Sequence, residues 1–290
     1  MAVALVDCQT HSGVMQGFMK RRPTPASSAS EPGLAHDDRG SGPVVVLIHG
    51  HPFDRRMWAP QLAALSAHMR LVAPDLPGYG QSPGGGAVMT MGLLADSVLG
   101  LMDALLIDRA TVAGLSMGGL VAMEIALAHP ERVSGVVLAA TTAAPVNAAE
   151  AEAREEQAQT LERDGTLPLT LEMAPKLFGV AARHRPALVS DVLEMMLHAP
   201  PAGAAAALRG RARRPDYSTL LTGLKVPSLL ISGDDDPYAG PEVVSQLITA
   251  LPEPVVEPFP GVGHLPNLEA PDRFNAVLLD FVADVSGPTA

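Results

Sequence analysis

The stretch Gly114-Leu115-Ser116-Met117-Gly118 decides the fold, because it sets a serine between two glycines where a strand meets a helix. Residues 110–113 before it are short and partly β-branched, as in a buried strand, and residues 119–128 after it combine helical periodicity with strong helix formers. So tight a turn needs glycine where side chains would clash, and it holds the serine hydroxyl at the helix N-terminus. The helix dipole and free N–H groups there favour a developing oxyanion, which makes Ser116 a candidate nucleophile.

Short apolar runs alternate with helical patterns on both sides of this turn. The runs that predict strands are 44–48, 70–74, 110–113, 133–138, 226–231 and 254–259. The segments that predict helices are 56–68, 91–106 with Thr90 as its cap, 119–128, 241–250 and 270–284. This alternation predicts an α/β fold whose mostly parallel central sheet is flanked by helices on both faces.

Residues 145–222 interrupt the alternation, since they contain no convincing strand. Their helical patterns fall at 147–163, 168–178, 186–198 and 203–213. A helical insertion between two strands of one sheet predicts a lid rather than a second domain. The expected organisation is a core over 31–144 and 223–290, the lid over 145–222, and a flexible or atypical leader over 1–30.

Charge and cysteine content narrow the classes of partner and compartment. The 290 residues carry a formal net charge of −11, which argues against binding to nucleic acid or to anionic membranes. The single cysteine, Cys8, allows no intrachain disulfide, and no apolar run is long enough to span a membrane. The basic residues at 20–22 follow the apolar start instead of preceding it, so a signal peptide is not expected and the predicted location is cytoplasmic.

A serine nucleophile needs a base and an acid that orients the base. His264, in a glycine-rich loop after the last predicted strand, is the candidate base, although a solvated loop histidine is the plainer interpretation of that residue alone. The acid is expected after 226–231, where Asp234, Asp235 and Asp236 are adjacent. Spacing from the preceding glycine favours Asp236, and its neighbours are expected to be solvated. The alternative loop, 139–149, contains no Asp or Glu.

An oxyanion hole needs two N–H donors, and the sequence offers one on each side of the site. Met117 follows the nucleophile, and His51 lies in the loop His49-Gly50-His51-Pro52 after the first buried strand. The backbone N–H groups of Met117 and His51 are therefore the predicted donors. The two histidines also suggest a metal site, but only Asp54 stands nearby, so neither a metal nor a cofactor is expected.

Five motifs stand in the order found in the α/β-hydrolase superfamily: His49–Pro52, Asp75-Leu-Pro-Gly-Tyr-Gly-Gln-Ser82, Gly114–Gly119, Gly233–Asp236 and Gly263-His264. The chain resembles this superfamily over about 31–284, and is most similar to its lidded carboxylesterase, enol-lactonase and cofactor-free perhydrolase branch. The resemblance implies the fold and a catalytic triad of Ser116, Asp236 and His264. Family members usually open with two antiparallel strands. Residues 33–43 resemble the end of that hairpin, while the Pro/Ser-rich leader replaces its first strand.

The leading functional prediction is a serine hydrolase that cleaves a small-molecule ester or lactone through an acyl-enzyme on Ser116. The same triad can cleave C–C bonds or form peracids, and a non-catalytic ligand-binding module on this fold is the alternative of another class. The sequence leaves acyl chain length and oligomeric state open.

Two further groups of residues allow a functional and a plain interpretation. The arginines at 209, 211, 213 and 214 predict a solvated helix end or, alternatively, recognition of a substrate carboxylate. Met173, Phe178, Met195 and Met196 line an acyl pocket or pack the lid onto the core. Trp58 is expected to pack a helix rather than to touch substrate.

Overall fold

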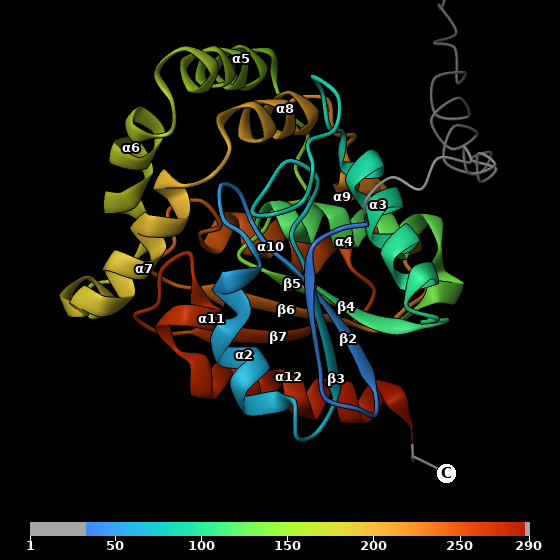
Figure 1. Cartoon of the computed structure of the whole chain (residues 1–290). Helices are drawn as coiled ribbons and strands as arrows, with labels where there is room; N and C mark the ends of the chain where they lie inside the picture. Colours follow the sequence, from blue (N-terminus) through green and yellow to red (C-terminus); the bar gives the residue numbers. More distant parts are fainter. Residues whose placement is uncertain (1–32, 288–290) are drawn as a thin grey trace, which may run out of the picture. The chain divides into compact units, whose positions relative to one another are not determined.

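The computed structural model of the chain describes residues 33–287, and the leader predicted over residues 1–30 lies outside this range. A seven-stranded sheet runs through the described part in the order β1-β3-β2-β4-β5-β6-β7 (Figure 1). Its strands are β1 (His36–Arg39), β2 (Val44–Ile48), β3 (Arg70–Pro74), β4 (Ala110–Leu115), β5 (Val133–Ala139), β6 (Ser228–Gly233) and β7 (Val255–Phe259). Only β1 is antiparallel, paired with β3 at the edge, so the predicted mostly parallel sheet is confirmed.

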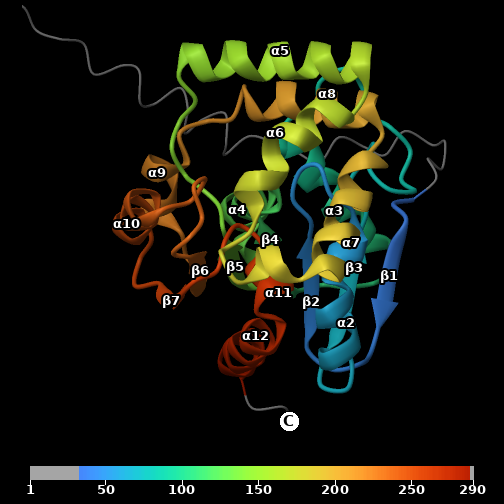
Figure 2. The same cartoon turned by 90° about the vertical axis from the view of Figure 1, so that its left-hand side faces the viewer.

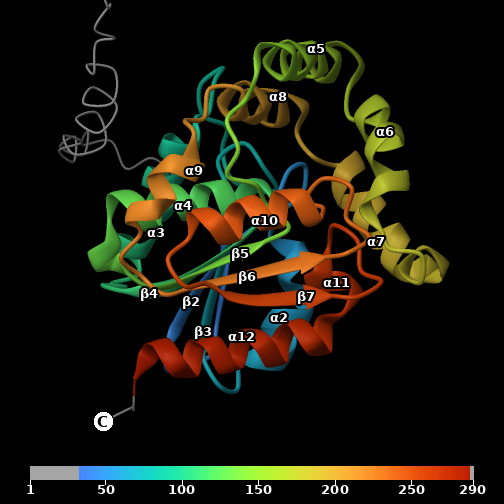
Figure 3. The same ribbon diagram turned by 180° about the vertical axis from the view of Figure 1, so that it is seen from behind.

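Helices cover both faces of the sheet, which explains why its central strands consist largely of buried apolar residues. One face carries α3 (Met91–Ala104), α4 (Met117–Ala128) and α10 (Pro241–Ala250), and the other carries α2 (Ala59–Leu65) and α12 (Pro271–Ser286) (Figure 3). The sheet thus separates two buried cores. Trp58 lies in the second core against Phe274 of α12, with ring centroids 5.9 Å apart, and so packs a helix as expected.

A helical segment follows β5 and precedes β6. It consists of α5 (Ala148–Asp164), α6 (Leu167–Leu177), α7 (Pro186–Leu197), α8 (Pro201–Arg211) and α9 (Tyr217–Leu220). Figures 1 and 2 show α5 and α8 stacked beyond the ends of the strands that carry Ser116 and its neighbours. The short connections are η1 (Arg55–Trp58), η2 (Pro130–Arg132), η3 (Ala182–His184), η4 (Leu221–Gly223) and α11 (Pro266–Glu269). None of the helices in residues 33–287 is long and apolar enough to cross a bilayer.

Several predicted elements differ in their bounds from the observed ones, and two of these differences have a physical explanation. The strand predicted over 226–231 lies at Ser228–Gly233, two residues later, and Pro227 stands just before it because proline has no N–H for the ladder. The helix predicted over 56–68 is divided into the 3₁₀ turn η1 and the α-helix α2. Asp54 caps the turn by accepting a hydrogen bond from the backbone N–H of Arg56.

The turn between β4 and α4 is as tight as the sequence predicts. Ser116 has a φ of 54° and a ψ of −112°, a conformation that L-residues rarely adopt. A Cβ on Gly114 would lie 2.1 Å from the carbonyl oxygen of Gly118, and one on Gly118 would lie 2.1 Å from that of Ile48. Three chain segments meet here, so both glycines are required for the close approach.

Gly114→Ala should therefore destabilise the fold, by about 1–3 kcal/mol if the backbone yields as overpacked cores do. The matched control is Gly100→Ala, at an exposed position of α3 where an added Cβ meets nothing within 4 Å. The control should raise stability by about 0.5–1 kcal/mol, because alanine favours a helix interior over glycine. Thermal unfolding of both variants measures this. Equal melting temperatures for the two would contradict the close approach at Gly114.

Candidate active site

His264 and Asp236, two of the predicted site residues, are joined in the structure. The carboxylate Oδ2 of Asp236 lies 2.8 Å from the imidazole Nδ1 of His264, and both side chains are buried. The second oxygen, Oδ1, accepts a hydrogen bond of 2.8 Å from the backbone N–H of Tyr238. Both carboxylate oxygens of Asp236 thus have hydrogen-bond partners. The contact with Nδ1 fixes the ring orientation of His264 and leaves its Nε2 available to accept a proton.

The other two aspartates of the triple face away from the imidazole. Asp234 accepts a hydrogen bond from the backbone N–H of Gly261, and Asp235 accepts one of 3.2 Å from that of Val180. Both residues are exposed. Of the three aspartates that the sequence left as alternatives, only Asp236 is buried and hydrogen-bonded to the histidine.

Ser116 and His264 line one cavity of about 250 Å³ between the sheet and the helical segment. Ser116 is partly exposed in it, and Thr141 supports the turn from behind, since its hydroxyl donates to the carbonyl oxygen of Ser116 at 2.7 Å. No hydrogen bond joins Ser116 to His264 within residues 33–287, and such contacts often tighten only when substrate is bound.

The predicted oxyanion donors are the backbone N–H groups of Met117 and His51. Met117 is the first residue of α4, where N–H groups have no partner inside the helix. Neither N–H has an intramolecular acceptor in the described part of the chain. His51 also lines the cavity with its side chain, and its Nδ1 shares a 2.7 Å hydrogen bond with the hydroxyl of Tyr79.

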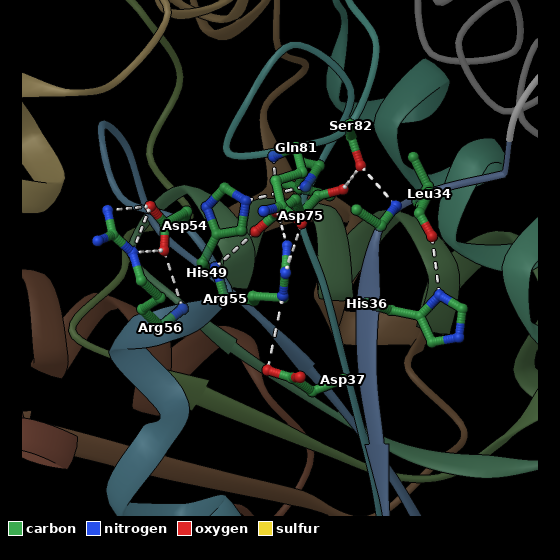
Figure 4. Close-up of polar contacts among 12 residues, drawn as sticks. Leu34, His36, Asp37, His49, Asp54, Arg55, Arg56, Asp75, Gln81 and Ser82 are labelled. Atoms are coloured by element: carbon green, nitrogen blue, oxygen red, sulfur yellow. Dashed lines mark hydrogen bonds and ion pairs between the residues drawn. The ribbon is translucent and has the colours of Figure 1, made fainter.

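A polar network holds the loop that carries His51 (Figure 4). The carboxylate of Asp75 accepts hydrogen bonds of 2.8 Å from the backbone N–H groups of Arg55 and Gln81, and pairs with the Arg55 guanidinium. His49 accepts one of 2.9 Å at Nε2 from the N–H of Leu76, while its Nδ1 donates to the adjacent carbonyl. The two loops that follow β2 and β3 are thereby tied together.

Both ring nitrogens of His49 are therefore engaged in hydrogen bonds, and Asp54 binds Arg56. Burial lowers the pKa of His49, so the imidazole is held neutral. Within residues 33–287 no group of three His, Cys, Asp or Glu side chains is arranged to hold a metal ion.

Glu269 is a residue of the site that the sequence analysis missed. Its Oε2 accepts hydrogen bonds from the backbone N–H groups of Gly179 at 2.8 Å and Gly263 at 3.1 Å, and its Oε1 accepts one of 3.1 Å from Leu265. The two loop donors flank His264 on either side. Glu269 therefore fixes the backbone that carries the imidazole, and no local pattern in the sequence indicates contacts with a segment 90 residues away.

The four arginines near the end of α8 take different roles, so neither single interpretation of the cluster holds. Arg209 binds two acids of α5, Glu155 and Glu162. Arg213 is exposed, and Arg214 donates to the carbonyl oxygen of Ala144 at 2.8 Å. Arg211 alone of the four lines the cavity.

The candidate apolar residues also divide. Met173 lines the cavity, together with Leu169 and Leu208. The remaining three, Phe178, Met195 and Met196, are buried in the core that lies on the α2 and α12 side of the sheet. Tyr238, which the sequence analysis did not single out, lines the cavity with its ring 5.0 Å from that of His264.

Three comparisons with known proteins agree with this fold. The family model of the alpha/beta hydrolase fold matches residues 43–271. A thermophilic esterase from Thermogutta terrifontis, solved with malate bound, is 36% identical with a TM-score of 0.85, and the match covers 87% of this chain and 93% of the esterase. A 3-oxoadipate enol-lactonase of Acinetobacter baylyi is 28% identical, over 84% of this chain and 90% of the relative.

A 2-hydroxy-6-oxononadienedioate/2-hydroxy-6-oxononatrienedioate hydrolase of Paraburkholderia phymatum is 31% identical, over 85% of this chain and 90% of that relative. These matches span nearly the whole described fold, from the sheet through the helical segment to the loop of His264. The chain belongs to the α/β-hydrolase fold family.

Proposed function

We propose that this protein is a serine hydrolase that cleaves a carboxylic ester or lactone through an acyl-enzyme on Ser116. The observation that carries the proposal is the buried 2.8 Å contact between His264 and Asp236, on the wall of the same cavity as Ser116. A buried carboxylate beside Nδ1 keeps the proton on that nitrogen, so Nε2 is left to accept the proton of the nucleophile.

Acylation then proceeds in two steps. The Oγ of Ser116 bonds to the acyl carbon as its proton passes to Nε2 of His264, and the carbonyl π electrons move to the oxygen. The backbone N–H groups of Met117 and His51 stabilise that oxyanion. When the oxyanion collapses, the C–O bond to the alcohol breaks and the leaving oxygen takes the proton from His264.

Deacylation repeats the sequence with water as the nucleophile. His264 takes a proton from water, the water oxygen bonds to the acyl carbon, and the bond to Ser116 Oγ breaks as the proton returns to Oγ. The free carboxylic acid leaves. The helices between β5 and β6 act as a lid in this scheme, because α5, α6 and α8 supply the outer wall of the cavity.

Relatives named as an esterase and an enol-lactonase support the coarse assignment, and the chain is a hydrolase that acts on ester or related bonds. The finer chemistry rests on the site. C–C bond cleavage and peracid formation use the same triad, and assays with several substrate classes distinguish them. A ligand-binding module without turnover is the alternative outcome of the first experiment below.

Ser116→Ala should lower turnover of p-nitrophenyl acetate by about 10³-fold or more, because no other group replaces the nucleophile. A fluorophosphonate probe followed by mass spectrometry should label Ser116 in the wild type. Ser245→Ala, at an exposed position of α10, is the matched control and should retain activity and labelling. Unchanged hydrolysis in Ser116→Ala would exclude the acyl-enzyme, and absence of labelling and turnover in the wild type would favour a binding module.

Asp236→Asn should reduce kcat by about 10³–10⁴-fold, because the amide cannot hold the imidazole in the required tautomer. Asp235→Asn makes the same change one residue away at an exposed position and should reduce kcat little. Steady-state kinetics on one ester measure both. Equal losses in the two variants would assign the effect to the loop rather than to the contact of Asp236 with His264.

Glu269→Gln should lower kcat more than it raises KM, because Glu269 positions His264 without lining the cavity. The amide loses the charge of a buried acceptor that binds three N–H groups, so the melting temperature should also fall. Glu253→Gln, at an exposed position, is the control and should change neither quantity. A Glu269→Gln variant with a lower melting temperature but wild-type kcat would restrict Glu269 to a structural role.

A further inference from the structure

Arg211 presents a partly buried guanidinium to the cavity, with no hydrogen-bond or ion-pair partner among the residues that the structure describes. It is the last residue of α8 and lines the same cavity as Ser116 and His264. Its Nε is buried without a hydrogen bond, and the side chain forms no ion pair within residues 33–287. Buried charges are normally paired, so this one indicates a partner that residues 33–287 do not supply.

A second arginine on the cavity wall is almost as poorly matched. Arg154 of α5 has a buried Nη1 without a hydrogen bond, and its only ion pair with another described residue is one of 3.9 Å with Glu150. Burial first, and then the positive charges of Arg154 and Arg214, together lower the pKa of Arg211 to about 10. Positive charge therefore accumulates on this side of the cavity.

The acids near the cavity do not neutralise this charge. Glu150 is half exposed and also accepts the backbone N–H of Asn147 in the capping box of α5. Glu172, the other acid on the cavity wall, lies near Lys176 at 3.7 Å and accepts a hydrogen bond from Gln157. Neither acid forms an ion pair with Arg211 in the described part of the chain.

The backbone of α8 is held firmly, which fixes the position of Arg211. A Cβ on Gly203 would lie 1.9 Å from the carbonyl oxygen of Gly78, and one on Gly210 would lie 1.6 Å from that of Met89. The two glycines are two helical turns apart, so one face of α8 lies against the loop that follows β3. Arg211 follows directly after the second of these contacts.

We propose that Arg211 and Arg154 form a carboxylate-binding subsite, and that the substrate is a small ester or lactone bearing a free carboxylate away from the scissile bond. This proposal rests on the proposed function of the same cavity. A guanidinium offers paired N–H donors in one plane, which match the two oxygens of a carboxylate. An anionic substrate would supply the negative charge that the two arginines lack as a partner.

The cavity also limits the length of the substrate. Its volume of about 250 Å³ is just below the usual range of ligand pockets, and its apolar lining includes Ala153, Leu169, Met173 and Leu208. This composition suits a short methylene chain between the reacting carbonyl and the carboxylate.

The test compares the mono-p-nitrophenyl ester of adipic acid with p-nitrophenyl hexanoate, which has the same chain length but no carboxylate. Wild-type kcat/KM should favour the charged ester, after subtraction of spontaneous hydrolysis. Arg211→Gln should lower this preference by about 10- to 100-fold, which is what loss of a charge-assisted hydrogen bond gives. Arg154→Gln should lower it in the same direction. Arg213→Gln, at an exposed position two residues on, should leave the preference unchanged.

Melting temperatures separate binding from folding. Removing an unpaired buried charge should leave the melting temperature of Arg211→Gln no lower than that of the wild type. A lower melting temperature with an unchanged substrate preference would assign Arg211 to the fold and overturn the proposal. A wild-type kcat/KM that is equal for the charged and the neutral ester would also overturn the proposal.

Adipate as a ligand tests the subsite without catalysis. In a thermal shift assay, adipate should raise the melting temperature of Ser116→Ala more than the neutral dimethyl adipate does. Adding Arg211→Gln to the Ser116→Ala variant should abolish that difference. Adipate binding without hydrolysis of any ester by the wild type would retain the subsite and reject the proposed function. Ester hydrolysis by the wild type, with no difference between adipate and dimethyl adipate in the thermal shift assay, would retain the proposed function and reject the subsite.

Discussion

The close approach of three backbone segments at the turn after β4 is the constraint on which the site depends. The carbonyl oxygens of Ile48 and Gly118 lie where side chains at Gly118 and Gly114 would otherwise project. The unusual backbone of Ser116 is supported on both sides, since its N–H donates to Ala139 and its carbonyl accepts from Thr141. Strain of this kind persists only where the surroundings determine it fully, and here the ends of β2, β4 and β5 supply them.

Much of the fold can be predicted from the sequence, because strands, tight turns and helix caps are determined by residues that are close together in the chain. The apolar runs of the sheet and the glycines around Ser116 follow from strand burial and turn sterics, and Thr90 does cap α3 as its sequence predicts. Long-range contacts were not accessible in the same way. The three aspartates after β6 are chemically alike. Spacing along the sequence favours Asp236, and packing against the loop of His264 places this carboxylate on the imidazole.

The arginine cluster illustrates the same limit more sharply. Which of four nearby arginines reaches the cavity depends on the rotation of α8, and that rotation is set by Gly203 and Gly210 against backbone far away in the chain. Arg154 comes from another helix altogether, so no spacing along the sequence pairs it with Arg211. Helical periodicity predicts which residues share one face of a helix. The contacts of each side chain depend on the element that packs against that face.

The end of α6 is fastened to the loop that carries the base. The N–H of His264 donates to the carbonyl oxygen of Leu177 at 2.8 Å, and Glu269 bridges Gly179 to that loop. An outward displacement of this end of α6 would break these hydrogen bonds, and His264 would lose the contacts that position it as the base. The wall of the cavity that α6 forms is consequently joined at Leu177–Gly179 to the loop that positions His264.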